Sequence, residues 1–149
     1  VLSYPAWINV IAETEEGQIV LERQYRYGLG VVSTEICAGV VEAGETPLQA
    51  ARRELEEETG YTGGRWEEIM TIAPNPGMMD NLCHCFHACG VKKTGSQHLD
   101  ETEDIEVFLR STEDVKRMLV QGDFIQALMA APLWKYFSSI ADTTRKGGI

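Results

Sequence analysis

The chain has 149 residues and a formal net charge of −10, and hydrophobic residues make up 44% of it. This length and balance suit one globular domain with an apolar core, and no apolar run reaches the length of a membrane span. The negative charge argues against nucleic acid and acidic membranes as partners, because both carry charge of the same sign.

The first half of the chain is predicted to form three strands and a helix. Runs of apolar and β-branched residues between turn residues predict strands over residues 8–13, 19–26 and 33–41. A helix is predicted over residues 47–59, with Thr46 as its N-cap, Pro47 at the first helical position and Gly60 at its end.

The second half is predicted to continue the sheet and to end in helices. The same patterns predict strands over residues 66–73, 82–90 and 105–110, and helices over residues 113–121 and 123–139. Loops are predicted over residues 74–77 and 92–104, and a loose tail from residue 143. Without a regular βαβ alternation, we predict a single mixed α/β domain over residues 1–149. The chain begins with Val1 rather than Met, so we allow for a missing N-terminal extension.

The predicted helix carries four glutamates within five positions, Glu54, Glu56, Glu57 and Glu58. On a helical wheel, Glu54, Glu57 and Glu58 share a sector beside the apolar stripe, whereas Glu56 lies on the solvent side. Like charges at this spacing repel one another, and divalent cations bound between them would relieve the repulsion. Because Mg²⁺ prefers carboxylate and phosphate oxygens, the cluster predicts a metal site; the alternative is a solvated acidic face.

The segment over residues 39–61, GVVEAGETPLQAARRELEEETGY, resembles the signature box of the Nudix hydrolase family. Every fixed position of that box is matched, by Gly39, Glu45, Arg53, Glu54, Leu55, Glu57, Glu58, Gly60 and Tyr61. The resemblance implies an α/β/α sandwich in which the box forms a loop, a helix and a second loop. It also implies hydrolysis of a nucleoside diphosphate linked to another group, with Mg²⁺ or Mn²⁺ as cofactor.

The same resemblance implies roles for individual residues. The implied metal ligands offer carboxylate or carbonyl oxygens, and they are Glu54, Glu57, Glu58 and the backbone carbonyl of Ala38. One of the three glutamates could instead orient the attacking water, so Glu57 is also a candidate catalytic residue. The resemblance also implies that Arg53 is a catalytic residue. Together with Glu45, it is expected to hold the loop against the helix.

Three stretches outside the box resemble the ADP-ribose pyrophosphatase subfamily. They are LERQYRYG over residues 21–28, the proline loop PNPG over residues 74–77, and DETEDIEV over residues 100–107. The implied reaction is the Mg²⁺-dependent hydrolysis of ADP-ribose to AMP and ribose 5-phosphate. The alternatives are a hydrolase of another nucleotide sugar or nucleoside diphosphate derivative, and a Nudix module that senses a nucleotide without cleaving it.

The subfamily resemblance also implies substrate contacts, at Arg26, Pro76, Gly77 and Asn81. Asn81 departs from the glutamate often found at this place, which keeps a different sugar in consideration, and Arg26 could instead be an ordinary surface arginine. The acidic loop would bring a general base to the site, with Glu101 as the better match and Glu103 as the alternative. By analogy with the subfamily, we also expect a homodimer.

The four cysteines, Cys37, Cys83, Cys85 and Cys89, lack the spacing of a secreted disulfide framework. We therefore expect reduced thiols and a cytoplasmic protein. A strand would place Cys83, Cys85, Cys89 and His87 in a line on one face, where they cannot easily surround a tetrahedral zinc ion. We interpret these cysteines as small buried thiols, with a zinc site as the alternative.

Overall fold

The computed structural model describes the backbone of residues 1–146 and the side chains of residues 1–141. Its strands are β1 (Trp7–Thr14), β2 (Gln18–Arg26), β3 (Val31–Glu35), β4 (Cys37–Val40), β5 (Tyr61–Ile72), β6 (Cys83–Lys93) and β7 (Ile105–Ser111). Its helices are α1 (Pro47–Thr59), α2 (Thr112–Gln121) and α3 (Ala127–Lys146). None of the described helices combines the length and apolar character needed to cross a membrane.

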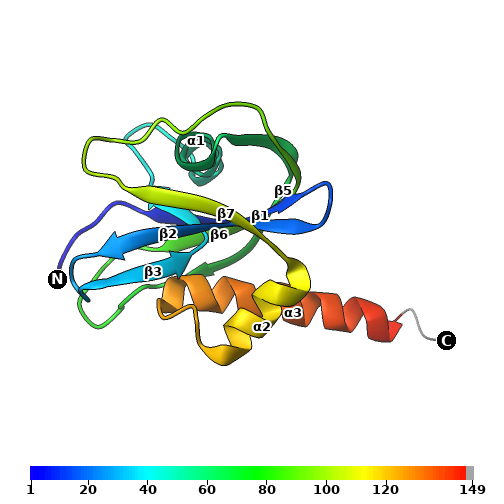
Figure 1. Ribbon diagram of the computed structural model, residues 1–149. Helices are drawn as coiled ribbons and strands as arrows, with labels where there is room; N and C mark the ends of the chain where they lie inside the picture. The colour runs from blue at the N-terminus through cyan, green and yellow to red at the C-terminus, as the bar shows by residue number, and fades with distance from the viewer. Residues whose placement is uncertain (147–149) are drawn as a thin grey trace.

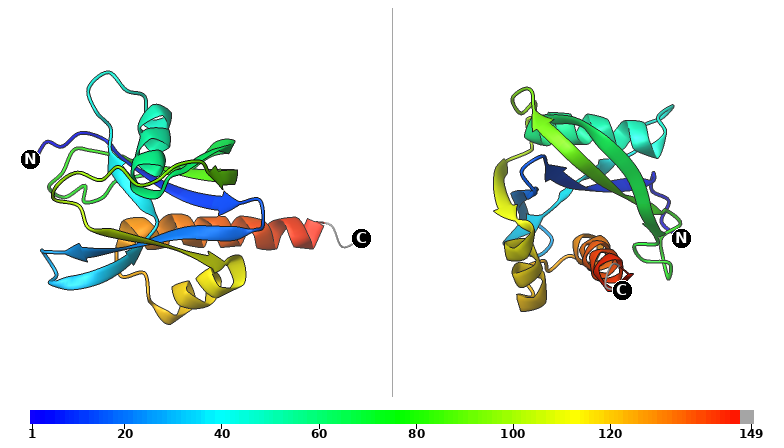
Figure 2. Two further views of the ribbon diagram at one scale, coloured as in Figure 1. Left: turned by 45° about the horizontal axis from the view of Figure 1, so that its top comes forward. Right: turned by 90° about the vertical axis from the view of Figure 1, so that its right-hand side faces the viewer.

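A mixed sheet lies between helices on both of its faces, with α1 on one side and α2 and α3 on the other (Figure 1). A second view shows α1 and α3 on opposite sides of the strands (Figure 2). The strand order is β3-β2-β1-β6-β5, while β4 pairs with β1 and β7 pairs with β2. Strands β1 and β6 are parallel and the other pairs are antiparallel, so the predicted α/β/α sandwich is confirmed.

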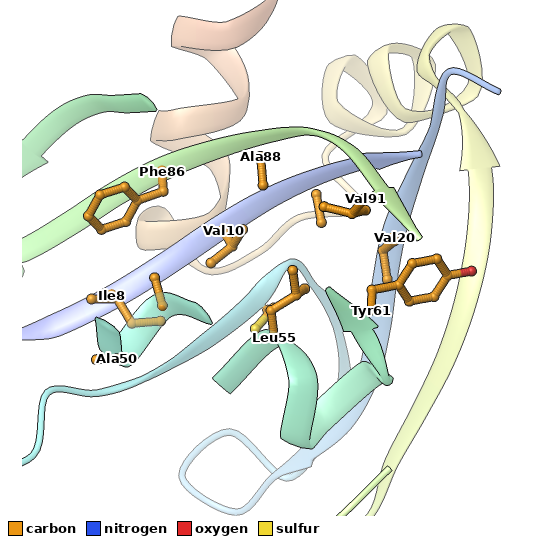
Figure 3. Packing of buried hydrophobic residues seen from close by; sticks show 12 residues of the cluster. Ile8, Val10, Val20, Ala50, Leu55, Tyr61, Phe86, Ala88 and Val91 are labelled. Atoms are coloured by element: carbon orange, nitrogen blue, oxygen red, sulfur yellow. The ribbon is translucent and has the colours of Figure 1, made fainter. Parts of the chain in front are cut away.

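Two hydrophobic clusters hold these layers together. The cluster between the sheet and α1 includes Ile8, Val10, Leu55 and Ala88 (Figure 3). The cluster beneath α2 and α3 includes Ile11, Leu21, Leu119 and Leu133. Neighbouring residues of β1, such as Val10 and Ile11, point to opposite faces, as strand geometry requires. Because helices cover both faces, the central strand is apolar on both sides.

The helix α1 is fixed at both ends by its own sequence. The Thr46 hydroxyl accepts a hydrogen bond from the Gln49 amide at 3.2 Å, and the Gln49 side chain accepts one from the Thr46 amide at 2.9 Å. Pro47 begins the helix, where its missing N–H costs nothing. Gly60 ends it at a φ of 74°, and a Cβ there would lie only 2.4 Å from the Gly95 carbonyl oxygen. The predicted bounds are therefore confirmed.

The prediction of one strand over residues 33–41 is wrong. Strand β3 pairs with β2, whereas β4 pairs with β1, and the chain changes partner at the buried Ile36. Strands β1 and β2 pair with each other at Glu13 and Ile19, near their shared turn, so the chain can pass between them beyond that point. The crossing brings β4 directly to the loop that leads into α1.

Other predicted bounds differ as well. Strand β6 continues to Lys93, so the predicted end of this strand at residue 90 and the start of the loop at residue 92 are wrong. Strand β5 begins at Tyr61 rather than at residue 66, because Gly63 and Gly64, both at positive φ, lie inside the strand instead of in a turn. Helix α3 begins at Ala127 rather than at residue 123. It also continues through residues 143–146, so the prediction of a loose tail is wrong there, while residues 147–149 lie outside the described residues.

Candidate active site

The predicted wheel of α1 is confirmed in the structure. Leu55 is buried against the sheet, and Glu56 is exposed on the opposite side. The three converging glutamates lie at increasing depth. The side chain of Glu57 is 44% exposed and that of Glu54 is 13% exposed, while Glu58 is 5% exposed. The row of carboxylates thus runs from the solvent into the protein.

Arg53 joins this row to the loop before the helix. Its Nε and Nη2 donate to the two carboxylate oxygens of Glu45 at 2.7 and 3.0 Å, and Nη2 also donates to the Val40 carbonyl at 3.0 Å. Its Nη1 donates to Glu54 at 2.9 Å and to Glu57 at 3.2 Å. These bonds fasten the loop to α1, which is the positioning role expected of Arg53 and Glu45, and they lower the pKa of Glu45.

Strand β4 brings Gly39 against the carboxylate of Glu54. A Cβ at position 39 would lie 2.2 Å from Cδ of Glu54, which is far inside contact distance. Burial raises the pKa of Glu54, and the neighbouring Arg53 acts in the opposite direction. Position 39 therefore requires glycine, because any larger side chain would occupy the space of the Glu54 carboxylate.

Replacing Gly39 with alanine is expected to weaken Mn²⁺ binding about 10-fold, because the new methyl group displaces the Glu54 carboxylate. The midpoint of thermal unfolding should change little, since the end of a flexible side chain can move aside. Isothermal titration with Mn²⁺ measures the first effect. Gly28→Ala is the matched control, because a Cβ at position 28 meets nothing within 4 Å. Equal Mn²⁺ affinity in both variants would argue against Glu54 as a ligand.

Glu58 faces a second buried acid, Glu22 of β2. Burial raises the pKa of Glu58 to about 7. Burial and the charge of Glu58 raise the pKa of Glu22 well above its ordinary value. Oε2 of Glu58 is buried and has no hydrogen-bond partner among the described residues. This free oxygen, beside two other carboxylates on the same helix face, fits the oxygen ligands that Mg²⁺ and Mn²⁺ take.

Without a metal ion, the protein is expected to lose stability as the pH rises from about 5 to about 8. The folded-state pKa values of Glu22 and Glu58 lie above the ordinary 4.5, so the folded state holds these protons more tightly than the unfolded state. Their contribution is complete below 4.5 and is lost as the pH rises through about 7. Each pKa unit corresponds to about 1.4 kcal/mol, so the loss should be a few kcal/mol.

Thermal unfolding in EDTA, at about pH 5.5 and about pH 8, measures this loss, and Mg²⁺ should reverse it by binding the ionised carboxylates. Glu22→Gln removes one of the two acids and should flatten the dependence. A Glu22→Gln variant with the same dependence as the wild type would contradict this account.

The acidic loop after β6 packs onto the last turn of α1. The Gln97 side chain donates to the carbonyls of Glu58 at 2.8 Å and of Ile105 at 2.9 Å. The backbone amide of His98 donates to the carbonyl of Glu57 at 2.7 Å. These bonds hold the loop beside the carboxylates of α1.

The structure separates the two candidate general bases in this loop. Glu103 is half-buried, its charge raises the pKa of Glu58, and its carboxylate accepts a hydrogen bond from the Asp100 amide at 3.0 Å. Glu101 is exposed to solvent. Glu103, the alternative candidate from the sequence, is therefore the more buried of the two and acts electrostatically on Glu58.

A pocket of about 370 Å³ lies between β4 and the start of α3. Its lining includes Trp7, Asn9, Arg26, Ala38, Gly39, Gln126, Leu128 and Met129. Arg26 is held there by two hydrogen bonds to the buried Glu35, one of them from Nε to Oε1 at 2.8 Å. The apolar walls and few fixed polar groups of this pocket suit a small-molecule ligand. The structure thus brings Arg26 and Ala38 into one pocket.

The other predicted substrate contacts lie elsewhere. Pro76 and Gly77 are exposed in the turn after β5, and neither lines the pocket that holds Arg26. Asn81 is 6% exposed, and its Nδ2 donates to the carbonyl of Pro5 at 3.0 Å. In this chain Asn81 therefore anchors the segment before β1.

All four cysteines are free thiols. Strand β6 carries three of them, with Cys83 and Cys85 buried and Cys89 half-buried. His87 on the same strand contacts Glu13, with Nε2 and Oε2 2.9 Å apart, and the Tyr136 hydroxyl donates to the same oxygen at 3.0 Å.

Sequence reasoning missed two buried acids of this site, Glu22 and Glu35. They are direct partners across β2 and β3. The signal was present in the alternation of β2, because Val20 packs in the core beneath α1 and Glu22 points to the same face two residues later. An acid on a buried face indicates a partner or a ligand.

A row of carboxylates that can hold a divalent ion, near a pocket that holds an arginine, suits the hydrolysis of a phosphate-containing substrate. Comparison with known proteins agrees. Residues 4–128 match the model of the NUDIX domain. The chain therefore belongs to the Nudix family, and it is a pyrophosphohydrolase of that family.

Individual relatives are similar over most of the chain. An ADP-ribose pyrophosphatase of Bacillus subtilis is 35% identical over 87% of this chain and 71% of its own length. A methanol dehydrogenase activator of Bacillus methanolicus is 41% identical over 72% of this chain and 58% of its own length. The crystal structure of an ADP compounds hydrolase matches with a TM-score of 0.83 and 19% identity, over 94% of this chain and 75% of that one. The last match shows the shared fold.

Proposed function

We propose that the protein hydrolyses the pyrophosphate bond of a nucleoside diphosphate sugar, and that ADP-ribose is cleaved to AMP and ribose 5-phosphate. The observation that carries the proposal is the row of Glu54, Glu57 and Glu58, which ends in a buried oxygen without a partner. The similarity to the ADP-ribose pyrophosphatase of Bacillus subtilis supports the choice of sugar nucleotide. A homodimer in the cytoplasm is part of the same proposal.

The metal ligands would be the carboxylates of Glu54, Glu57 and Glu58 with the backbone carbonyl of Ala38. When bound, Mg²⁺ or Mn²⁺ supplies positive charge that screens the pyrophosphate and favours a hydroxide nucleophile. Arg53 holds Glu54 and Glu57 in place from one side. Arg26, oriented by Glu35, offers positive charge to a phosphate or to the terminal ribose in the pocket.

The general base in this proposal is Glu103. It takes a proton from the attacking water while the water oxygen bonds to phosphorus and the bond from that phosphorus to the bridging oxygen breaks. The bridging oxygen leaves on the phosphate of the other product. The half-buried position of Glu103 beside Glu58 supports this choice over the exposed Glu101.

Glu103→Gln is expected to lower kcat about 100-fold, because it removes the acceptor of the water proton. Glu101→Gln is the matched control, because it makes the same chemical change two residues away in the same loop. It should change kcat less than about 3-fold. Steady-state hydrolysis by both variants decides between them. The reverse order would return the role of base to Glu101.

A different nucleotide sugar is the second candidate substrate. The observation that favours it is Asn81, which is turned to the Pro5 carbonyl instead of lining the Arg26 pocket. A panel of ADP-ribose, other nucleotide sugars, dinucleoside polyphosphates and nucleoside triphosphates with Mg²⁺ tests the choice. We expect ADP-ribose to be cleaved fastest. Faster cleavage of another sugar nucleotide would overturn the assignment of the sugar, and binding without any cleavage would favour a sensing module.

A further inference from the structure

Three side chains from different elements converge at the buried end of the row of carboxylates. They are Glu22 of β2, Cys37 of β4 and Glu58 of α1, and one ligand atom of each lies within 4.8 Å of the others. All three are buried, with exposures of 2%, 1% and 5% in that order. The group is therefore closed to bulk water and comes from three separate parts of the chain.

Two oxygens in this group have no hydrogen-bond partner among the described residues, Oε1 of Glu22 and Oε2 of Glu58. The arginine whose charge reaches Glu22 is Arg26, and it is hydrogen-bonded to Glu35 instead. The two acids share a hydrogen bond, and Glu58 also bonds to Cys37, so one oxygen of each acid is left without a partner. Buried polar atoms without partners are costly, and proteins normally pair them or use them to bind metals. The group therefore has two of the features of an internal ligand site, burial and free acceptors.

The donor types in the group indicate which ion it would take. Mg²⁺ takes oxygen ligands and has little affinity for sulfur. Zn²⁺ and Co²⁺ accept a thiolate together with carboxylate oxygens, in sites of four ligands. One thiolate and two carboxylates supply three of the four ligands, and a water molecule carried in with the ion would be the fourth.

We propose that Glu22, Cys37 and Glu58 form a buried site for a divalent transition-metal ion, with the thiolate of Cys37 as one ligand. On binding, the metal–sulfur bond replaces the S–H bond, and the thiol proton, with any proton on the two carboxyl groups, passes to solvent without a change of oxidation state. The site shares Glu58 with the proposed catalytic metal centre. It goes beyond the proposed function, because Glu22 and Cys37 bind the ion from behind, whether or not a substrate is cleaved.

Cobalt binding tests the proposal without any substrate. Titration of the reduced protein with Co²⁺ should produce a thiolate-to-cobalt charge-transfer band in the near ultraviolet that saturates at one ion per chain. The band should disappear in Cys37→Ser. In Glu22→Gln the band should remain, with Co²⁺ affinity lowered at least about 10-fold.

The matched control is Cys89→Ser, because Cys89 belongs to a second group of possible metal ligands among the described residues, with Glu13 and His87. A band that persists in Cys89→Ser and is lost in Cys37→Ser supports the proposal. A wild type without the band, or a band lost only in Cys89→Ser, overturns it. If Cys37→Ser does not fold, Glu22→Gln decides, and unchanged Co²⁺ affinity in that variant overturns the proposal. Hydrolysis with Mg²⁺ is measured separately, so failure here leaves the proposed function standing.

Discussion

Replacing Glu58 with glutamine is expected to reduce the hydrolysis of ADP-ribose about 100-fold or more, and to leave the protein folded. The substitution removes the carboxylate whose buried Oε2 has no partner, and with it a ligand for the ion that stabilises charge in the transition state. Because it also removes a like charge beside Glu22, the metal-free variant should unfold at a higher temperature than the wild type at about pH 8.

Steady-state kinetics and thermal unfolding in EDTA measure these two opposite effects. Glu56→Gln makes the same chemical change on the solvent side of α1 and should leave both quantities near the wild-type values. If Glu58→Gln lost both activity and stability, Glu58 would affect hydrolysis by stabilising the folded protein and not as a metal ligand. A Glu58→Gln variant with the turnover of the wild type would remove Glu58 from the proposed metal ligands.

Replacing Arg53 with lysine is expected to lower kcat/KM about 100-fold, although the positive charge is kept. A lysine cannot make the paired bonds to both oxygens of Glu45 and also orient Glu54 and Glu57. The loop over residues 40–45 should loosen, and the free energy of unfolding should fall by about 2 kcal/mol.

Kinetics and chemical denaturation of Arg53→Lys test this expectation. Arg52→Lys is the matched control, because Arg52 is exposed at the preceding position of α1 and lies over the ring of Trp66. A folded Arg53→Lys variant with wild-type kcat/KM would show that the hydrogen bonds of the Arg53 guanidinium group are not needed to position the glutamates. Equal losses in both variants would point to a general effect on α1.

The sequence predicts α1 and its carboxylates well because the relevant information is local. The cap at Thr46, the stop at Gly60 and the wheel that separates Glu56 from Glu58 all depend on residues within a few turns. The sequence identified Gly39 as a fixed position of the signature box, but it did not show why glycine is required there. Only the structure shows that Glu54 occupies the space of the absent side chain.

The contacts between distant segments could not be predicted in the same way. At Ile36 the chain stops pairing with β2 and begins to pair with β1. This change depends on contacts across the sheet and not on the local sequence pattern. The preference for Glu103 over Glu101 depends on how the acidic loop packs on α1. Glu22 was predicted only as part of a strand, and its closeness to Cys37 and Glu58 depends on how distant segments of the chain come together.

The most direct test of the proposed function is the hydrolysis of ADP-ribose by the wild-type chain during a titration with Mg²⁺, with the products separated by chromatography. We predict AMP and ribose 5-phosphate in equal amounts, formed at a rate that rises with Mg²⁺ and falls to background in EDTA. The same products at an undiminished rate in EDTA, or no cleavage of ADP-ribose at any Mg²⁺ concentration, would contradict it.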